Sequence, residues 1–239
     1  MPTRHGGRLV LAAPQRPGRT GSIAWIRTLE LETIYGRARA YLHPVDQPRA
    51  ALVLGHGAGG GVTARDLVAA TAAARREDVS VALVEQPYRV AGRRSPAPAR
   101  QLDAAWLAVV ARLGEHELHG LPLLVGGRSS GARVACRTAH LAGAVGVVCL
   151  AFPLQPPGRT GAASAAPSRL SELDEVTVPV LVVQGTRDRF GVPPAAVQRT
   201  VIPVAGDHSL KTDLPAVAAA VQGWLAGVLA SPARPAREG

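Results

Sequence analysis

The sequence has little of what marks several large classes of protein. Aromatic residues make up 3% of the 239 residues, and Lys211 is the only lysine among 27 basic side chains. No apolar run approaches the roughly 18 residues that span a bilayer. The apolar run nearest the N-terminus, residues 9–13, is too short for a secretory signal. We therefore expect a cytoplasmic protein that does not act at a membrane.

Cysteine and concentrated basic charge are also scarce in the body of the chain. Cys136 and Cys149 form no CxxC pair, so we expect two reduced, buried thiols rather than zinc or thiol–disulfide chemistry. The net charge is +10, but half of the excess falls in residues 1–22 and 231–239, and no nucleic-acid-reading motif is present. We predict no metal ion, no organic cofactor and no nucleic-acid partner.

Short apolar segments alternate with helical ones along the remainder of the chain. An apolar stretch of about five residues, a loop and then a helical period recur, which indicates an α/β fold whose mostly parallel central sheet is flanked by helices. Fully apolar stretches such as 121–125 and 180–183 indicate strands buried on both faces. We expect a hairpin over 29–42, further strands at 51–54, 79–84, 121–125, 144–152, 178–184 and 200–204, and helices at 65–77, 101–113, 131–141, 194–199 and 214–229.

The composition divides the chain into one domain and two tails. Residues 1–22 are rich in Pro, Gly and Arg without periodicity, so we predict a flexible extension. Residues 23–230 form the predicted domain, and residues 231–239 a flexible tail. Residues 153–172 show no clear element and are too few for a large lid, so we expect a minimal cap.

The sharpest motif is Gly127-Arg128-Ser129-Ser130-Gly131, which matches the nucleophile elbow G-x-S-x-G. The predicted strand before it and the predicted helix after it supply the required setting. Its glycines allow the helix to approach a neighbouring strand around a strained turn. We predict that Ser129 is a nucleophile. The alternative is a Gly/Ser-rich loop that merely caps a helix.

A serine nucleophile needs a base and an orienting acid, in the chain order Ser, Asp or Glu, His. Asp188 follows the predicted strand 178–184, and His208 follows the predicted strand 200–204. We predict that His208 is the general acid–base and that Asp188 orients it. Asp207 and Glu85 are alternative acids.

The loop from His56 to Gly61 follows another predicted strand. Backbone N–H groups of Ala58 and Ser130 are the predicted oxyanion donors. A phosphate-binding loop is the competing interpretation, but the segment lacks the G-K-[ST] ending. Candidate substrate-binding residues are His56 and, for an anionic group, Arg89, Arg93 and Arg94. Solvated arginines, or ion pairs with Glu85, are the alternative.

Several stretches together resemble the α/β-hydrolase superfamily: LGHGAGG (54–60), EQPYRVAGRR (85–94), VGGRSSGARVA (125–135), VQGTRDRFG (183–191) and GDHSL (206–210). Within it, the chain resembles the small branch near dienelactone hydrolases, which includes testis-expressed and NSL-complex-subunit homologues. The resemblance implies a triad of Ser129, Asp188 and His208 and the two oxyanion donors named above. The resemblance names no substrate; from the predicted nucleophile and its partners we expect cleavage of an ester or thioester of a small acyl substrate through an acyl-enzyme on Ser129. The alternative is a catalytically silent scaffold of the same fold that binds a protein partner.

Overall fold

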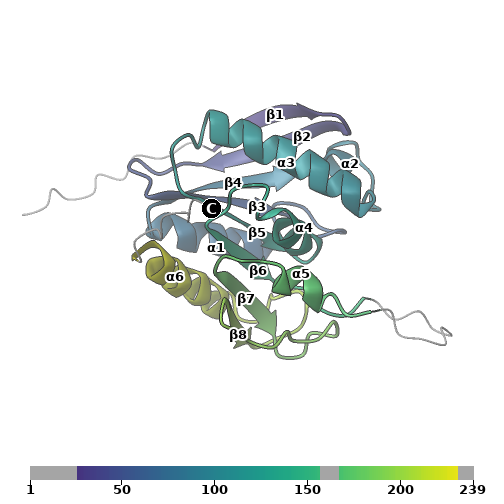
Figure 1. Ribbon diagram of the computed structural model, residues 1–239, viewed down its shortest axis with the longest axis vertical. Coiled ribbons are helices and arrows are strands. Elements are labelled where there is room, and N and C mark those ends of the chain that lie inside the picture. Colours follow the sequence, from purple (N-terminus) through teal and green to yellow (C-terminus); the bar gives the residue numbers. More distant parts are fainter. Residues whose placement is uncertain (1–25, 157–166, 231–239) are drawn as a thin grey trace, which may run out of the picture.

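An eight-stranded sheet forms the centre of the protein, which a computed structural model describes over residues 26–156 and 167–230 (Figure 1). The order across the sheet is β1-β2-β4-β3-β5-β6-β7-β8. Strand β2 is antiparallel to β1 and β4, and all other neighbours are parallel. The mostly parallel sheet is thus confirmed. The strands are β1 (Arg27–Thr33), β2 (Gly36–His43), β3 (Ala50–Gly55), β4 (Val79–Glu85), β5 (Leu123–Arg128), β6 (Gly146–Leu150), β7 (Val180–Gly185) and β8 (Arg199–Val204).

Helices cover both faces of this sheet (Figure 1). One face carries α1 (Arg65–Arg76) and α6 (Leu214–Ala230), whose buried side chains join one apolar cluster. The other face carries α3 (Ala99–Glu115), α4 (Ser130–Thr138) and α5 (Leu170–Asp174), which join a second cluster. A single turn, α2 (Pro87–Val90), follows β4. The central strands are apolar because both of their faces are covered.

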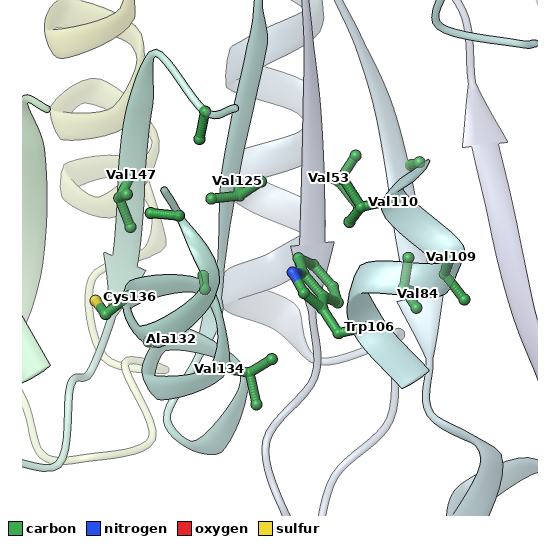
Figure 2. Packing of buried hydrophobic residues seen from close by; sticks show 14 of the residues in the cluster. Val53, Val84, Trp106, Val109, Val110, Val125, Ala132, Val134, Cys136 and Val147 are labelled. Atoms are coloured by element: carbon green, nitrogen blue, oxygen red, sulfur yellow. The ribbon is translucent and has the colours of Figure 1, made fainter. Parts of the chain in front are cut away.

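The second cluster packs α3 and α4 side by side on the sheet. Figure 2 shows Trp106 of α3 over the strand that carries Val53, with Ala132 and Val134 of α4 beside it. Trp106 is 1% exposed. This packing fixes α4, and therefore the turn that precedes it, against the ends of β3 and β5.

The structure departs from the sequence-based elements at several places. The predicted helix at 194–199 is absent; the chain there is extended and closes a tight turn through paired backbone hydrogen bonds between Ala196 and Arg199. The end of this segment pairs with the sheet instead: the Val180 N–H donates to the Gln198 carbonyl, and Arg199 begins β8. The short helices α2 and α5 were not predicted, and α5 begins within the segment 153–172, where no element was expected. Helix α4 ends at Thr138, three residues earlier than expected.

Other expectations concern the cysteines and the tails. Cys136 and Cys149 are buried and free, with their sulfur atoms 3.5 Å apart. Within the described ranges, no helix is long and apolar enough to cross a membrane. The predicted flexible segments 1–22 and 231–239 lie outside the described residues, as do residues 157–166 of the predicted minimal cap.

Candidate active site

The carboxyl ends of parallel strands meet at one edge of the sheet, and three polar side chains converge there. Ser129 directly follows β5, Asp188 lies in the loop after β7, and His208 lies in the loop after β8. The Nε2 atom of His208 is 2.9 Å from Ser129 Oγ, and its Nδ1 atom is 2.7 Å from Asp188 Oδ2. The structure therefore brings the three predicted catalytic residues into one hydrogen-bonded chain.

Ser129 occupies a backbone conformation that few L-residues adopt, with φ 52° and ψ −109°. Its N–H donates to the carbonyl oxygen of Leu150 on β6, which holds the turn. Two glycines allow α4 to lie directly on β3: a Cβ on Gly127 would stand 2.6 Å from the carbonyl oxygen of Gly55, and one on Gly131 would collide with the same carbonyl. This close packing makes the sharp turn possible.

Asp188 is held as a buried hydrogen-bond acceptor. Its side chain is fully buried, its Oδ1 accepts the Phe190 N–H at 2.9 Å, and its Oδ2 faces His208. An ionised carboxylate only accepts, so the His208 Nδ1 must carry a proton. In the neutral imidazole, Nε2 is then free to accept the Ser129 hydroxyl proton. The edge of the Phe190 ring packs against the imidazole, with centroids 4.5 Å apart.

Gln184 supports the acid and was not singled out in the sequence. This side chain of β7 is fully buried, and its Nε2 lies 2.8 Å from Asp188 Oδ2, 3.0 Å from the Phe152 carbonyl and 2.9 Å from the Gly191 carbonyl. It ties three segments to the carboxylate. The available signal was a glutamine inside an otherwise apolar strand, four residues before Asp188, where a buried amide requires partners.

The two alternative acids lie in other interactions. Asp207 is exposed and its Oδ1 accepts the N–H and the hydroxyl of Ser209, which also lowers the pKa of Asp207. Glu85 accepts the Tyr41 hydroxyl at 3.3 Å and lies 3.7 Å from Arg39. Asp188 is the acid that contacts His208.

The loop after β3 passes beside the nucleophile. A Cβ on Gly57 would lie 3.6 Å from the Ser129 Cβ. The next residue, Ala58, accepts the Tyr88 hydroxyl through its carbonyl at 2.9 Å, and no hydrogen bond from its own N–H is found within the described residues. Ser130 begins α4, where the first N–H groups have no partner inside the helix. Ser130 thus directly follows the nucleophile, and Ala58 follows the glycine that packs beside it.

His56 differs from its predicted role as a substrate-binding residue. It is 3% exposed and both ring nitrogens are occupied: Nδ1 donates to the Gly57 carbonyl at 2.8 Å, and Nε2 accepts the Gln86 N–H at 3.1 Å. Burial lowers the pKa of His56, which favours this neutral form. The side chain ties the loop after β3 to the loop after β4 and has no free polar atom for a substrate.

The three candidate arginines lie around α2. Arg93 lines a cavity of about 440 Å³ at the end of the β1–β2 hairpin, together with Tyr88, Gln86 and Gln101. Arg89 donates to the Arg93 carbonyl at 3.4 Å, and Arg94 is exposed. This cavity is at the same edge of the sheet as Ser129, because the start of β2 lies beside the end of β4. Of the three, only Arg93 is among the residues that line this cavity, which Glu32 and Arg37 also line.

No cluster of three or more metal-binding side chains occurs in the described parts of the chain. The polar groups at the site are a hydroxyl, an imidazole, a carboxylate and backbone N–H groups. This set can transfer a proton, supply an oxygen nucleophile and stabilise an anion.

Comparisons with known proteins agree with this architecture. The solved structure of Est1E from Butyrivibrio proteoclasticus superimposes with a TM-score of 0.68 at 16% identity, covering 85% of this chain and 99% of that one. XC6422 from Xanthomonas campestris, an α/β serine hydrolase without a lid, gives 0.67 at 18% identity and covers 93% and 100%. Dienelactone hydrolase from Anabaena variabilis gives 0.66 at 14% identity and covers 85% and 97%.

The sequence comparisons complement these structural ones. No curated protein matches the sequence. The family model of the alpha/beta hydrolase domain matches residues 48–215, which include the nucleophile elbow, Asp188 and His208. The chain therefore belongs to the α/β-hydrolase family.

Proposed function

We propose that this α/β hydrolase is a serine hydrolase that cleaves an ester or thioester of a small acyl substrate through an acyl-enzyme on Ser129. The observation that carries the proposal is the chain of two short hydrogen bonds from Ser129 through His208 to Asp188. Structural neighbours described as an esterase and as a lidless serine hydrolase support it. At 18% identity or below, their likeness extends only to the fold.

In the first half-reaction, His208 Nε2 takes the hydroxyl proton as Ser129 Oγ attacks the carbonyl carbon. Negative charge develops on the carbonyl oxygen, where the N–H groups of Ala58 and Ser130 stabilise it. The imidazolium then protonates the leaving alcohol or thiol, and Asp188 holds the ring in place throughout. In the second half-reaction, His208 deprotonates a water molecule that attacks the acyl-enzyme; the bond between the acyl carbon and Ser129 Oγ then breaks, the imidazolium returns its proton to Oγ, and the acid is released.

The cavity beside α2 is the proposed place for the part of the substrate remote from the bond that breaks. Its volume falls within the range of small-molecule sites, roughly 300–1,000 Å³. The guanidinium of Arg93 has no ion-pair partner within the described residues, so it is available to an anionic group. Tyr88 lines this cavity and donates its hydroxyl hydrogen to the Ala58 carbonyl. This links the cavity to the loop after β3, residues 56–61, which we call the oxyanion loop.

The test is turnover and covalent labelling of three purified proteins. We expect the wild type to hydrolyse p-nitrophenyl acetate and to react with a fluorophosphonate probe at Ser129. Ser129→Ala should lower kcat by about 10⁴-fold or more and abolish labelling, because the nucleophile is lost. Ser171→Ala, on the exposed surface of α5, is the control and should match the wild type.

The same proteins separate the proposal from a silent scaffold. A folded wild type that neither turns over any member of an ester and thioester chain-length panel nor takes the probe would overturn the hydrolase assignment. Labelling of Ser129→Ala at wild-type rate would overturn the assignment of the nucleophile.

A further inference from the structure

Arg128, the residue between Gly127 and the nucleophile, has a side chain whose nitrogens each meet a different segment. Its Nε lies 2.9 Å from Asp66 Oδ2 on the first turn of α1. Its Nη2 donates to the backbone carbonyl of His208 at 3.0 Å. Its Nη1 lies against the Cα of Gly57, where a Cβ would stand only 2.8 Å away. The guanidinium thus contacts helix α1, the histidine loop and the oxyanion loop at once.

From this geometry we propose that Arg128 is a positioning residue. It holds His208 within hydrogen-bond distance of Ser129, and it fixes the position of the loop after β3 relative to the nucleophile. The inference rests on the proposed function of the site. The imidazole must stay within hydrogen-bond distance of the hydroxyl, and displacements of about 1 Å in such sites reduce rates about 100-fold. His208 lies in a loop, so its backbone needs an anchor other than a sheet hydrogen bond, and Arg128 Nη2 supplies one.

Asp66 explains why the anchor is rigid. Its carboxylate is 1% exposed, and Oδ1 accepts the Leu67 N–H at 3.0 Å, so the group cannot rotate freely. Burial raises the pKa of Asp66, and the Arg128 cation counteracts this. A planar guanidinium donates in several fixed directions, whereas the single nitrogen of a lysine cannot face all three segments.

A role in stability alone accounts less well for this arrangement. Replacing a buried ion pair by neutral groups of similar volume is often neutral or stabilising, so such a pair is weak support for stability. Gly57 is also consistent with the proposal, because any side chain there would displace the guanidinium. The pair is therefore explained best by the geometry that it imposes on the two catalytic loops.

The chain contains a matched control for this arginine. Arg137, on the last turn of α4, is 19% exposed against 18% for Arg128, and it forms a bidentate pair with Asp103 on α3. It contacts α3 and α5 and none of the catalytic loops. The two arginines are alike in exposure and each pairs with an aspartate, which is 1% exposed at Asp66 and 23% exposed at Asp103, but they differ in what they anchor.

The experiment compares Arg128→Met/Asp66→Asn with Arg137→Met/Asp103→Asn, so that neither variant leaves its paired carboxylate uncompensated. For the first we expect kcat for p-nitrophenyl acetate to fall about 10- to 100-fold, with KM within about threefold of the wild type. The rate of fluorophosphonate labelling should fall in parallel. For the second we expect kcat within about threefold of the wild type, whatever the change in thermal midpoint.

A further variant keeps the test decisive if the first double variant does not fold. Arg128→Lys retains a cation beside Asp66 but loses the planar guanidinium and its separate donor nitrogens. We expect its kcat to fall about tenfold with a near-native melting curve. A kcat within threefold of the wild type in folded Arg128→Lys or in the double variant would overturn the inference while leaving the nucleophile assignment intact. If the wild type itself takes no probe at Ser129, both proposals fall.

Discussion

The two ends of the parallel strands differ in which non-glycine residues take a positive φ. At the amino ends, positive φ is taken by Gly120 before β5, by Gly143 before β6 and by Asp78 before β4. Glycine has no Cβ to clash there, and aspartate tolerates this region better than most residues. At the carboxyl ends, Gly92, Gly191 and Gly206 also take positive φ, but so do Ser129, Ala151 and Leu210, with φ near 50°, and these three residues are not suited to it.

Such conformations disfavour folding by about 1–3 kcal/mol each and persist only where the surroundings hold them. Each of the three has its backbone N–H tied: Ser129 donates to Leu150, Ala151 to Val183 and Leu210 to Asp207. The strain therefore collects at the edge that carries the catalytic side chains. The amino-end turns only reverse the chain, whereas the carboxyl-end turns also aim Ser129 and place His208.

The sharpest way to test this comparison is to add one methyl group at each end. Gly131→Ala at the carboxyl end puts a Cβ into the Gly55 and His56 carbonyls, although the φ of Gly131 is not positive. We expect a loss of about 3 kcal/mol or more of unfolding free energy, because rigid backbone must move. Gly143→Ala at the amino end has open space but a φ of 62°, so we expect a loss of about 1 kcal/mol.

Urea unfolding followed by circular dichroism measures both losses. Activity adds a second readout, since Gly131→Ala displaces the start of α4 and with it the Ser130 N–H, whereas Gly143→Ala should retain kcat. Equal losses of stability would mean that the backbone around Gly131 accommodates an added methyl group as easily as the open space at Gly143 does.

A smaller effect is expected where the change removes strain instead of adding crowding. Ala151→Gly relieves a φ of 51° but also removes a buried methyl group. The two contributions are each about 1 kcal/mol and of opposite sign, so we expect a net change near zero. Ala82→Gly on β4 removes an equally buried methyl with no strain to relieve, and we expect it to destabilise by about 1 kcal/mol.

Thermal or urea unfolding of these two variants gives the difference directly. An equal loss in both would show that the conformation at Ala151 carries no strain, and the contrast between the two ends would then rest on Ser129 and Leu210 alone.

The sequence predicted the parallel strands and the elbow because their patterns are local. A continuous apolar run such as that of β7 indicates a strand covered on both faces, and G-x-S-x-G between a strand and a helix specifies a turn. The helix expected at 194–199 was wrong because the end of this segment pairs with β7, which no local pattern contains: the Val180 N–H donates to the Gln198 carbonyl, and Arg199 begins β8. The short helices α2 and α5 are too brief to show a periodicity.

The supporting residues of the site depend on contacts that no local pattern contains. Gln184 on β7 and Asp188 in the loop after it are four residues apart, but the Phe152 carbonyl that completes their cluster comes from the segment after β6. Arg128 meets Asp66, 62 positions earlier, and His208, 80 positions later. His56 looked like a ligand residue in a glycine-rich loop, and only its burial and its partner Gln86 show the tether.

Two histidines, one at each end of the strands, allow the comparison to be refined by pH. His56 lies at the carboxyl end and is buried, whereas His43 closes β2 beside the amino end of β4 and is half-buried. Burial lowers the pKa of both from the ordinary value of 6.5, and Arg75 adds to the effect at His43. Each folded side chain therefore resists a proton that the unfolded chain accepts below about pH 6.5.

The sign follows from this difference in proton binding: the stability that neutral His56 contributes is present above pH 6.5 and is lost as the pH falls toward its lowered folded-state pKa. Protonation of Nε2 would also remove the acceptor of the Gln86 N–H. We expect the melting temperature of the wild type to exceed that of His56→Gln at pH 7.5 by a few degrees, about 2–4 °C per kcal/mol, and this gap to shrink at pH 5.5. His43→Gln should show a smaller change of gap, and His119→Gln, at an exposed position, none. A difference in melting temperature between wild type and His56→Gln that stays constant with pH would contradict this prediction. It would mean that the buried His56 imidazole takes up a proton as readily as the unfolded chain does, and that the carboxyl edge favours a neutral histidine no more than the amino edge does.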